Sequence, residues 1–437
     1  MSGMKDTIAG QLPITTSHEV AQQNAPRREQ YDLAIVGGGI VGLATARELL
    51  LRRPGLRLVV LEKDSAIAMQ QSGHNSGVLH TGIYYAPGSL KARACVEGYR
   101  RMLAFCDEND IPYQLCGKLI VALNDGELSR LDELYRRGVA NGVQGLEMMG
   151  PERLREIEPY VTGIRAIYSP NTGIVDYERV AQAYARHVQQ RGGELVVGHK
   201  VTTIVRRAEW AILSTRRTTD NAGPDIQARY VITSAGLQSD KVSALEYGKR
   251  DVRIVPFRGD YYKLRHDKRH MVKGLIYPVP DLRFPFLGVH FTLRPDGEIW
   301  AGPNAVLAFA REGYGRWDLS IPDLWDALSY TGFWKMAAKY WRTGVREMHR
   351  DYSKRAYLKE LQRYLPQLQP EDVVPGPSGV RAQALAPDGQ LVDDFLVRRS
   401  ANIIHVQNAP SPAATSSLMI ANMITDEAEN AFDLGTE

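Results

Sequence analysis

Three glycines and one glutamate have the types and spacing of a dinucleotide-binding site. Gly37, Gly39 and Gly42 form the pattern G-x-G-x-x-G, and Glu62 follows twenty residues after the last glycine. In such a site the first glycine makes a tight turn, the second lets the backbone approach a pyrophosphate, and the third lets a helix pack closely on a strand. The acidic residue then accepts hydrogen bonds from a ribose. These four residues predict that the chain binds a dinucleotide.

A second segment equipped for chemistry follows at residues 70–85. It reads Gln-Gln-Ser-Gly-His-Asn-Ser-Gly-Val-Leu-His-Thr-Gly-Ile-Tyr-Tyr, with small and hydrogen-bonding residues where a surface loop usually carries Asp, Lys or Pro. This composition is typical of a backbone that passes beside a ligand. The imidazole of His80 titrates near neutral pH and can accept a proton from a substrate, and the alternative is a histidine with a purely structural role.

The elements that must position these residues are strands and helices in alternation. Residues 33–36 are a short apolar run typical of a buried parallel strand, residues 40–51 are helical, and residues 58–61 form a second strand that ends at Glu62. A later buried strand at 230–235 runs into Gly236 and a helix at 237–245. We expect that turn to be a second approach of the backbone to the same cofactor.

From Val252 onward the composition changes to that of a second sheet. The segments 253–264, 274–278, 286–293 and 298–301 alternate, are rich in aromatic and β-branched residues, and are separated by Pro and Asp-Gly signals. Residues 317–364 are predicted to be helical. The end of the chain returns to the first pattern, with a strand at 402–406, a loop at 407–412 and a helix at 415–424 whose N-terminus can stabilise negative charge on a bound cofactor.

The composition bounds the class of protein. The chain has 437 residues, which favours two domains, and its net charge of +4 is too small to indicate a nucleic-acid partner. The three cysteines, Cys95, Cys106 and Cys116, fit a reducing compartment and neither a metal site nor a disulfide framework. No run approaches the roughly 20 apolar residues of a spanning helix. Residues 1–30 lack the apolar stretch of a signal peptide and are expected to be a disordered tail.

One predicted helix carries an unusual mixture of side chains. Residues 333–350 combine four large aromatic side chains with five basic ones, and Glu347 is the single acid among them. An aromatic and basic helix can lie on a membrane surface. The commoner explanation is a helix packed on its own domain. Both interpretations stay open on the sequence alone.

Five motifs resemble one family. The segments Gly73-His-Asn-Ser-Gly-Val-Leu-His-Thr-Gly-Ile-Tyr-Tyr, Pro256-Phe-Arg-Gly-Asp-Tyr-Tyr, Gly302-Pro-Asn-Ala, Gly379-Val-Arg-Ala-Gln-Ala and Asn408-Ala-Pro-Ser-Pro-Ala-Ala-Thr-Ser resemble the FAD-dependent D-amino-acid-oxidase superfamily and, within it, the L-2-hydroxyglutarate oxidases and dehydrogenases. The similarity runs from about Tyr31 to about Ala431. The longer polar N-terminal tail departs from the family pattern and bears on targeting rather than on chemistry.

The resemblance implies an α/β fold with two parts. An FAD-binding Rossmann-like domain is expected from residues 31–110, 170–251 and 370–431, and a substrate-binding domain with a mixed or antiparallel sheet and helices from 111–169 and 252–369. The residues implied to hold FAD are Gly37, Gly39, Ile40, Val41, Gly42, Glu62, Lys63, Asn75, Ser76, Gly77, Val201, Ala235, Gly236, Ala413, Ala414 and Thr415.

The implied reaction is oxidation of L-2-hydroxyglutarate to 2-oxoglutarate by hydride transfer from C2 to flavin N5. His80 matches the histidine that related enzymes place over the flavin, where it can act as the base. The two carboxylates of the substrate call for fixed cations. Arg381 is the first choice because a guanidinium grips a carboxylate with two parallel hydrogen bonds, and Arg258, Tyr261 and His290 are further candidates for the pocket.

Other classes of function remain as alternatives. The glycine motif also permits an NAD-dependent dehydrogenase, and the resemblance also permits a flavin oxidase of glycerol 3-phosphate or of an amino acid. A flavoprotein scaffold without catalysis is a third alternative. The expected electron acceptor is a membrane quinone or oxygen, and no nucleic-acid partner is expected. The expected location is the cytoplasm, with peripheral contact to the inner membrane left open.

Overall fold

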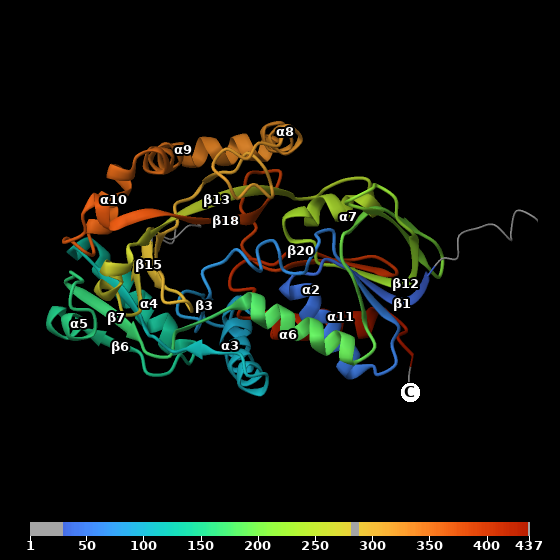
Figure 1. Ribbon diagram of the computed structural model, residues 1–437, viewed down its shortest axis with the longest axis horizontal. Coiled ribbons are helices and arrows are strands. Elements are labelled where there is room, and N and C mark those ends of the chain that lie inside the picture. The colour runs from blue at the N-terminus through green and yellow to red at the C-terminus, as the bar shows by residue number, and fades with distance from the viewer. Residues whose placement is uncertain (1–28, 281–287, 436–437) are drawn as a thin grey trace, which may run out of the picture.

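Two β-sheets, of eight and nine strands, carry most of the fold (Figure 1). The computed structural model describes residues 29–280 and 288–435 of the chain. The sheets lie toward opposite ends of the long axis, with β1 and β12 near one end and β6 and β7 near the other. A small third sheet consists of β3 (Val78–Leu79), β8 (Gly173–Val175) and β4 (Tyr113–Gln114). The predicted α/β class with two sheet-based parts is confirmed.

The first sheet has a parallel centre. Strand β1 (Glu29–Val36) lies between β2 (Leu58–Leu61) and β12 (Asp225–Thr233) and runs parallel to both. The remaining strands of this sheet are β9 (Glu194–Val196), β10 (His199–Arg206), β11 (Ala211–Arg217), β19 (Leu396–Arg399) and β20 (Ile403–Asn408). Near the end of the chain β20 adds itself in parallel to the C-terminal half of β12.

Both faces of the first sheet are covered, which explains its continuous apolar strands. Leu33 and Ile35 pack against the core formed by helices α2 (Ile40–Arg52), α3 (Leu90–Glu108), α6 (Tyr177–Gln190) and α11 (Ser417–Ala431). The alternate residues Ala34 and Val36 pack on the other side, with strands β10 and β11 and helix α7 (Ser239–Tyr247). The period of two along β1 therefore separates two cores.

The second sheet is mixed and mostly antiparallel. Its strands are β5 (Lys118–Ala122), β6 (Glu147–Met149), β7 (Arg165–Ser169), β13 (Arg253–Leu264), β14 (Leu275–Pro278), β15 (His290–Leu293), β16 (Ile299–Gly302), β17 (Val306–Leu307) and β18 (Val373–Leu385). The predicted strand 286–293 is described from residue 288 on, and its first two residues lie outside the described part. Because β18 pairs with β13 from Arg253 to Leu264, the range 370–431 contributes to both sheets rather than to the first alone.

Helices cover the second sheet on both faces. Helices α5 (Pro151–Ile157) and α10 (Lys354–Gln362) pack over the core that contains Leu119 and Phe291, and α4 (Leu128–Ala140) packs over the core that contains Ile120 and Tyr277. Helices α8 (Ile321–Leu328) and α9 (Thr331–Tyr352) lie above β13 and β18 (Figure 1).

The predicted continuous helical region 317–364 is three helices. The side chain of Ser320 accepts a hydrogen bond from the Asp323 amide at the start of α8, and the side chain of Ser353 accepts one from the Ala356 amide at the start of α10. A serine at such a position satisfies amides that have no partner inside the helix, so the periodic pattern continues while the chain changes direction.

Candidate active site

The glycine turn after β1 leaves no room for side chains. Gly37 has a φ of +117°, and a Cβ at this position would collide with the Ser234 carbonyl of the second predicted turn. A Cβ on Gly42 would collide with the Gly37 carbonyl. Gly39 is the N-cap of α2 and offers no side-chain cap, so the start of the helix can face a phosphate. The amide of Ile40 donates to Ser72 Oγ at 2.9 Å, which ties the turn to the polar segment, and Val41 packs at the edge of the helix core.

Glu62 closes the same turn at the end of β2. Its Oε2 accepts from the Gly38 amide at 2.7 Å and its Oε1 from the Asp64 amide at 2.9 Å. Burial raises the pKa of this carboxyl group. The neighbouring Lys63 places Nζ at 2.7 Å from both Asp64 Oδ1 and Glu312 Oε2, so its charge is already paired within the chain.

The second turn, after β12, lies directly against the first. The Ser234 amide donates to the Val36 carbonyl at 2.8 Å, and Ala235 and Gly236, with a φ of +50°, begin the short helix η2 (Gly236–Gln238). The Ser234 hydroxyl is buried and has no hydrogen-bond partner among the described residues. A turn that excludes a Cβ at Gly37 and Gly42, with an orphaned hydroxyl beside it, fits a bound dinucleotide. Val201 is buried in β10, on the same side of the sheet as Val36.

The polar segment is held in place by its own side chains and by the C-terminal loop. The Asn75 amide group donates to the Ser72 carbonyl at 2.6 Å and accepts from the Gly77 amide at 2.8 Å. Ser76 is half-buried, and Gly77 has a φ of +74°. Thr415 is fully buried, and its hydroxyl accepts from the His80 amide at 3.2 Å.

Thr415 also joins the C-terminal loop to α6. Its hydroxyl lies 2.7 Å from the Tyr177 hydroxyl. Ala413 and Ala414 pack at the edge of the core around α11. The structure therefore brings together three predicted segments that are far apart in the sequence, at residues 37–42, 75–80 and 413–415. Whether each residue touches FAD stays a prediction.

The imidazole of His80 forms no hydrogen bond to the described residues. The residue is half-buried, and its hydrogen bonds to described residues use the backbone. The pKa of His80 is held well below its usual value, first by burial, then by the positive charge of Lys118 and last by the interaction with His290. The ring is therefore neutral at physiological pH, the state in which it can accept a proton.

A row of five side chains crosses one face of the second sheet near His80. Its members, in strand order, are Arg381 on β18, Tyr261 on β13, His290 on β15, Tyr277 on β14 and Lys118 on β5. The rings of Tyr277 and His290 are stacked with centroids 4.0 Å apart, and Lys118 Nζ lies 4.3 Å from the Tyr277 centroid. The row thus holds an imidazole and two phenols between two cations.

The row is strongly positive and buried. His290 is held neutral, because burial, Arg381 and Lys118 lower its pKa to about 3, although the Gly288 carbonyl opposes the shift. Burial also lowers the pKa of Lys118 to about 8, while nearby cysteine thiols oppose this weakly. Burial raises the pKa of the Tyr261 hydroxyl, and Arg381 works against that shift. These effects place Arg381, predicted as the carboxylate contact, beside His290 and Tyr261.

Arg258 does not join this row, contrary to its grouping with the other pocket candidates. It follows Phe257, which pairs with Arg381 across β13 and β18, so it points to the opposite face of the sheet. Its guanidinium donates to Asp260 at 2.8 Å and lies 3.5 Å from Asp351. Burial with two acids gives Arg258 a structural ion pair instead of a place in the pocket.

Sequence reasoning missed two members of the row, Lys118 and Tyr277. The signal for Lys118 was present, because a lysine stands at the head of the continuous apolar strand Leu119–Ala122, whose every residue is buried. Lysine is almost never fully buried without a partner. Tyr277 gave no such signal, since a tyrosine in an apolar strand is ordinary core.

Taken together, the row and His80 can bind a small anion and remove a proton from it. The described residues hold no cluster of His, Cys, Asp or Glu side chains placed to bind a metal ion. The chemistry that the described side chains support is therefore recognition of negative charge beside a neutral imidazole, close to a dinucleotide site.

Comparison with known sequences identifies relatives along nearly the whole chain. A family model described as DAO, FAD dependent oxidoreductase, matches residues 32–427. L-2-hydroxyglutarate dehydrogenase, mitochondrial, of Nematostella vectensis is 52% identical over 93% of this chain and 92% of its own. The human protein of the same name is 48% identical over 92% of this chain and 90% of its own, and L-2-hydroxyglutarate dehydrogenase of Indibacter alkaliphilus is 45% identical over 92% and 100%.

Solved structures share the fold at low identity. A dithionite-reduced L-α-glycerophosphate oxidase of Mycoplasma pneumoniae with FAD bound has a TM-score of 0.72 and 22% identity, covering 91% of this chain and 94% of its own. Glycine oxidase of Bacillus cereus has a TM-score of 0.65 and 18% identity over 92% and 95%. The chain belongs to the FAD-dependent oxidoreductase family and, within it, to the L-2-hydroxyglutarate dehydrogenases.

Proposed function

We propose that this protein oxidises L-2-hydroxyglutarate to 2-oxoglutarate with FAD as its cofactor. The observation that carries the proposal is the neutral imidazole of His80 beside a buried cationic row. Relatives named L-2-hydroxyglutarate dehydrogenase, 45–52% identical to the chain, support the same substrate. A dicarboxylate with a secondary hydroxyl group needs both cations and a proton acceptor, and this site offers both.

The residues divide the work as follows. Arg381 binds a carboxylate with two parallel hydrogen bonds and orients the hydroxyl-bearing carbon. His80 accepts the hydroxyl proton, a role typically worth 10²–10⁴-fold in rate. Bound FAD supplies the acceptor for the hydride that leaves C2. Gly37, Gly39 and Gly42 would form the turn that holds the pyrophosphate of FAD, and Glu62 would bind its ribose.

Anaerobic flavin bleaching tests the proposal. The purified protein is mixed without oxygen with 2-hydroxy acids, each as both enantiomers, and the flavin absorbance is followed. We expect rapid bleaching by L-2-hydroxyglutarate and little by the D-enantiomer. Glycerol 3-phosphate and amino acids belong in the same panel. The substrate assignment is wrong if one of these bleaches the flavin and L-2-hydroxyglutarate does not. A colourless protein that reduces NAD would instead indicate the nicotinamide alternative.

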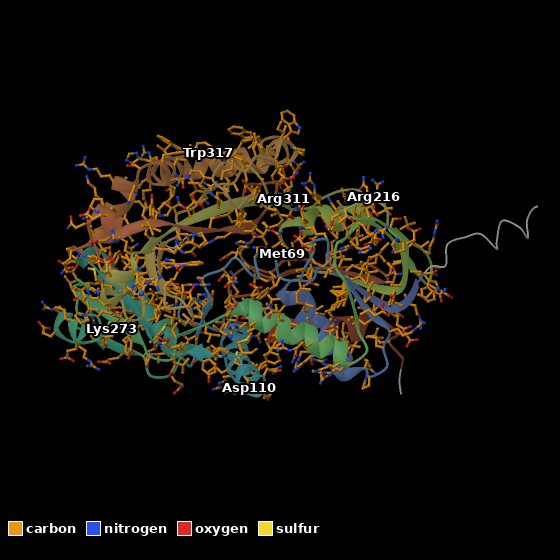
Figure 2. The ribbon with its side chains drawn as sticks, viewed as in Figure 1. Met69, Asp110, Arg216, Lys273, Arg311 and Trp317 are labelled. Carbon is orange, nitrogen blue, oxygen red and sulfur yellow. The ribbon has the colours of Figure 1, made fainter. Side chains whose placement is uncertain are left out.

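We further propose that the protein contacts a membrane through α8 and α9. The described helices include none that is both long and apolar enough to cross a bilayer. Large apolar side chains are nevertheless exposed there, and Figure 2 shows Trp317 at the outer edge beside α9. The exposed apolar surface consists of Trp317, Leu319, Ile321, Trp325, Trp334, Trp341, Val345 and Met348. Trp317 is 75% exposed and Trp325 71%, which is unusual for the most apolar of aromatic side chains.

The helix at 333–350 packs on its own domain with one face and exposes aromatic and basic side chains on the other, so each of the two interpretations describes one face. Phe333 and Met336 are buried against Val255 and Leu385 of the second sheet, as a helix packed on its own domain requires. On the outer face, Lys339, Arg342 and Arg346 are exposed beside the tryptophans. Basic residues near an anionic surface contribute about 1 kcal/mol each. These features support reversible binding to the inner face of a bacterial membrane, where a quinone would accept the electrons faster than oxygen.

Co-sedimentation with anionic vesicles tests the membrane proposal. We expect the wild-type protein to sediment at low salt, and a Trp325→Glu/Trp341→Glu variant to remain in the supernatant with full flavin content. The matched control is Arg216→Glu, because Arg216 is exposed on β11 of the first sheet, at the other end of the molecule (Figure 2). If the wild-type protein stays in the supernatant at low salt, the membrane proposal fails while the proposed oxidation stands.

A further inference from the structure

We infer that Lys118 is a substrate-binding residue that holds the carboxylate far from the reacting carbon, while Arg381 holds the carboxylate beside it. The inference rests on the proposed function, because it names the residue that recognises the second carboxylate of that substrate.

Lys118 is a buried cation that has no acid partner among the described residues. Its side chain is 2% exposed, and among the described residues Nζ forms no hydrogen bond and no ion pair. Among the described residues, Nζ contacts the faces of Tyr277, at 4.3 Å, and Tyr84, at 5.4 Å. Contacts of a cation with aromatic rings are weaker than a buried ion pair and do not replace one.

Four titratable side chains besides the two tyrosines interact with Lys118. The charged and titratable side chains that interact with it are His80, His290, Cys95 and Cys116. Burial raises the pKa of the Cys95 thiol to about 12, so it supplies no negative charge at neutral pH. An anion must therefore come from outside the described residues. A carboxylate of the substrate has the charge and the hydrogen-bonding capacity that an ammonium group requires.

Lys118 and Arg381 lie at opposite ends of the row, and Arg381 is at the end nearer the first sheet. Strand β18, which carries Arg381, contacts both η2 and β20 of the first sheet, where the dinucleotide is bound. Strand β5 lies beyond β16, β15 and β14 in the strand order, so Lys118 is at the far end of the row. The long side chains of Arg381 and Lys118 both act on His290. A short dicarboxylate bound over His290 therefore puts its reacting end toward Arg381 and its other end toward Lys118. His290 and the two tyrosines lie between them.

This placement has a consequence for the base. The positive charge of Lys118 contributes to the low pKa of His80 in the protein without substrate. A carboxylate bound to Lys118 cancels that charge and strengthens His80 as a proton acceptor. A substrate without the second carboxylate leaves His80 a weaker base. Recognition of the distal charge is in this way coupled to proton removal.

The test removes the positive charge from residue 118 and, separately, the distal negative charge from the substrate. Lys118→Met keeps the length of the side chain and removes its charge. In each protein, kcat/KM for anaerobic flavin reduction is measured with L-2-hydroxyglutarate and with L-2-hydroxypentanoate, which has the same carbon chain without the distal carboxylate. The ratio of the two values within one protein cancels changes in folding, flavin content or base strength that act on both substrates.

We expect the preference for the dicarboxylate to fall roughly 10- to 100-fold in Lys118→Met, the range for a hydrogen bond to a charged group. Lys118→Arg should recover part of the preference. The control variant is Lys273→Met, because Lys273 is an exposed lysine just before β14 (Figure 2) and should keep the wild-type ratio.

An unchanged ratio in Lys118→Met overturns the inference, even if both rates fall together. A fall of the ratio in Arg381→Lys but not in Lys118→Met overturns it as well, because it assigns the distal carboxylate to Arg381. Failure of the wild-type protein to react with L-2-hydroxyglutarate is a different result, since it removes the proposed function itself.

Discussion

Two buried cations in this protein have opposite surroundings. Arg311 is 1% exposed and lies against Asp240 and Asp326, with Asp323 nearby. Lys118 is equally buried and, among the described residues, has only aromatic rings, thiols and other bases around it. A buried charge is stable only when it is paired. Arg311 therefore completes the fold, whereas Lys118 weakens the fold until an anion arrives.

The same contrast separates Arg258 from Arg381. Arg258 is paired with Asp260 and Asp351 on one face of β13 and β18, and Arg381 lies on the other face with His290 and Tyr261. Arg258 is 3% exposed, whereas Arg381 is half-buried. The two acids beside Arg258 give it a structural role.

The largest expected effect follows from breaking the paired cluster. Arg311→Met leaves Asp240, which is 1% exposed, without its main partner, and we expect a loss of about 3–5 kcal/mol in the free energy of unfolding. Urea denaturation checks this against Arg216→Met, an exposed arginine on β11. A loss below about 1 kcal/mol, the range of a surface ion pair, would show that the paired cluster is not structural.

For Lys118, the unpaired cation, loss of the charge is expected to raise the free energy of unfolding, whereas loss of the Arg311 charge lowers it. The pKa of Lys118 is about 8 in the folded protein, below its ordinary value of 10.5, so the unfolded chain binds more protons between these two pH values. Raising the pH through this window should therefore stabilise the substrate-free protein, by about 3 kcal/mol in total. The quantity to measure is the free energy of unfolding of wild type minus that of Lys118→Met. A flat difference between pH 8 and 10.5 contradicts the prediction.

A smaller effect is expected from the base. His80→Ala should retain FAD and lose on the order of 10²-fold or more in the rate of anaerobic flavin reduction. Stopped-flow absorbance gives the rate, and the flavin spectrum of the purified variant gives the cofactor content. His74→Ala serves as the control, because His74 stacks on Tyr314 at 3.8 Å and has no proposed role. A near-normal rate in His80→Ala would leave His80 a structural histidine.

The smallest effect is expected from a variant that keeps the positive charge of Arg381 and changes only its hydrogen-bonding geometry. Arg381→Lys keeps the positive charge of the row but loses the two parallel hydrogen bonds. We expect half-saturation for L-2-hydroxyglutarate to rise on the order of 10-fold with FAD retained. Titration of the flavin reduction rate against substrate concentration measures it. Unchanged half-saturation would place the carboxylate contact on another side chain.

The first sheet was predictable because its signals are local. The strand at 58–61 has the predicted bounds, and the glycine turn, Glu62 and the second turn at Ser234–Gly236 lie together as expected. Each signal is contained in a stretch of a few dozen residues, where strand, turn and helix follow one another. A short apolar run, a glycine turn and a helical period together predict such a unit.

The second sheet was harder because its partners are distant in the sequence. Arg258 and Arg381 look alike in the sequence, and their roles depend on strand register and on Asp351, which is 93 residues from Arg258. The function of Lys118 is hidden for the same reason, since His80, Tyr277 and His290 come from three other segments. The break between α9 and α10 depends on one capping serine, Ser353, that the helical period does not reveal.

The late position of β20 has a consequence for how the protein is made. This strand and the loop that follows it complete the dinucleotide-binding edge, because β20 pairs with β12 and Thr415 binds the His80 backbone. A ribosome releases them only after more than nine-tenths of the chain has been synthesised. Until then the nascent chain exposes the edge of β12 and the core face that α11 covers. A chain that includes β20 and Thr415, rather than a shorter nascent one, therefore presents the complete dinucleotide-binding edge.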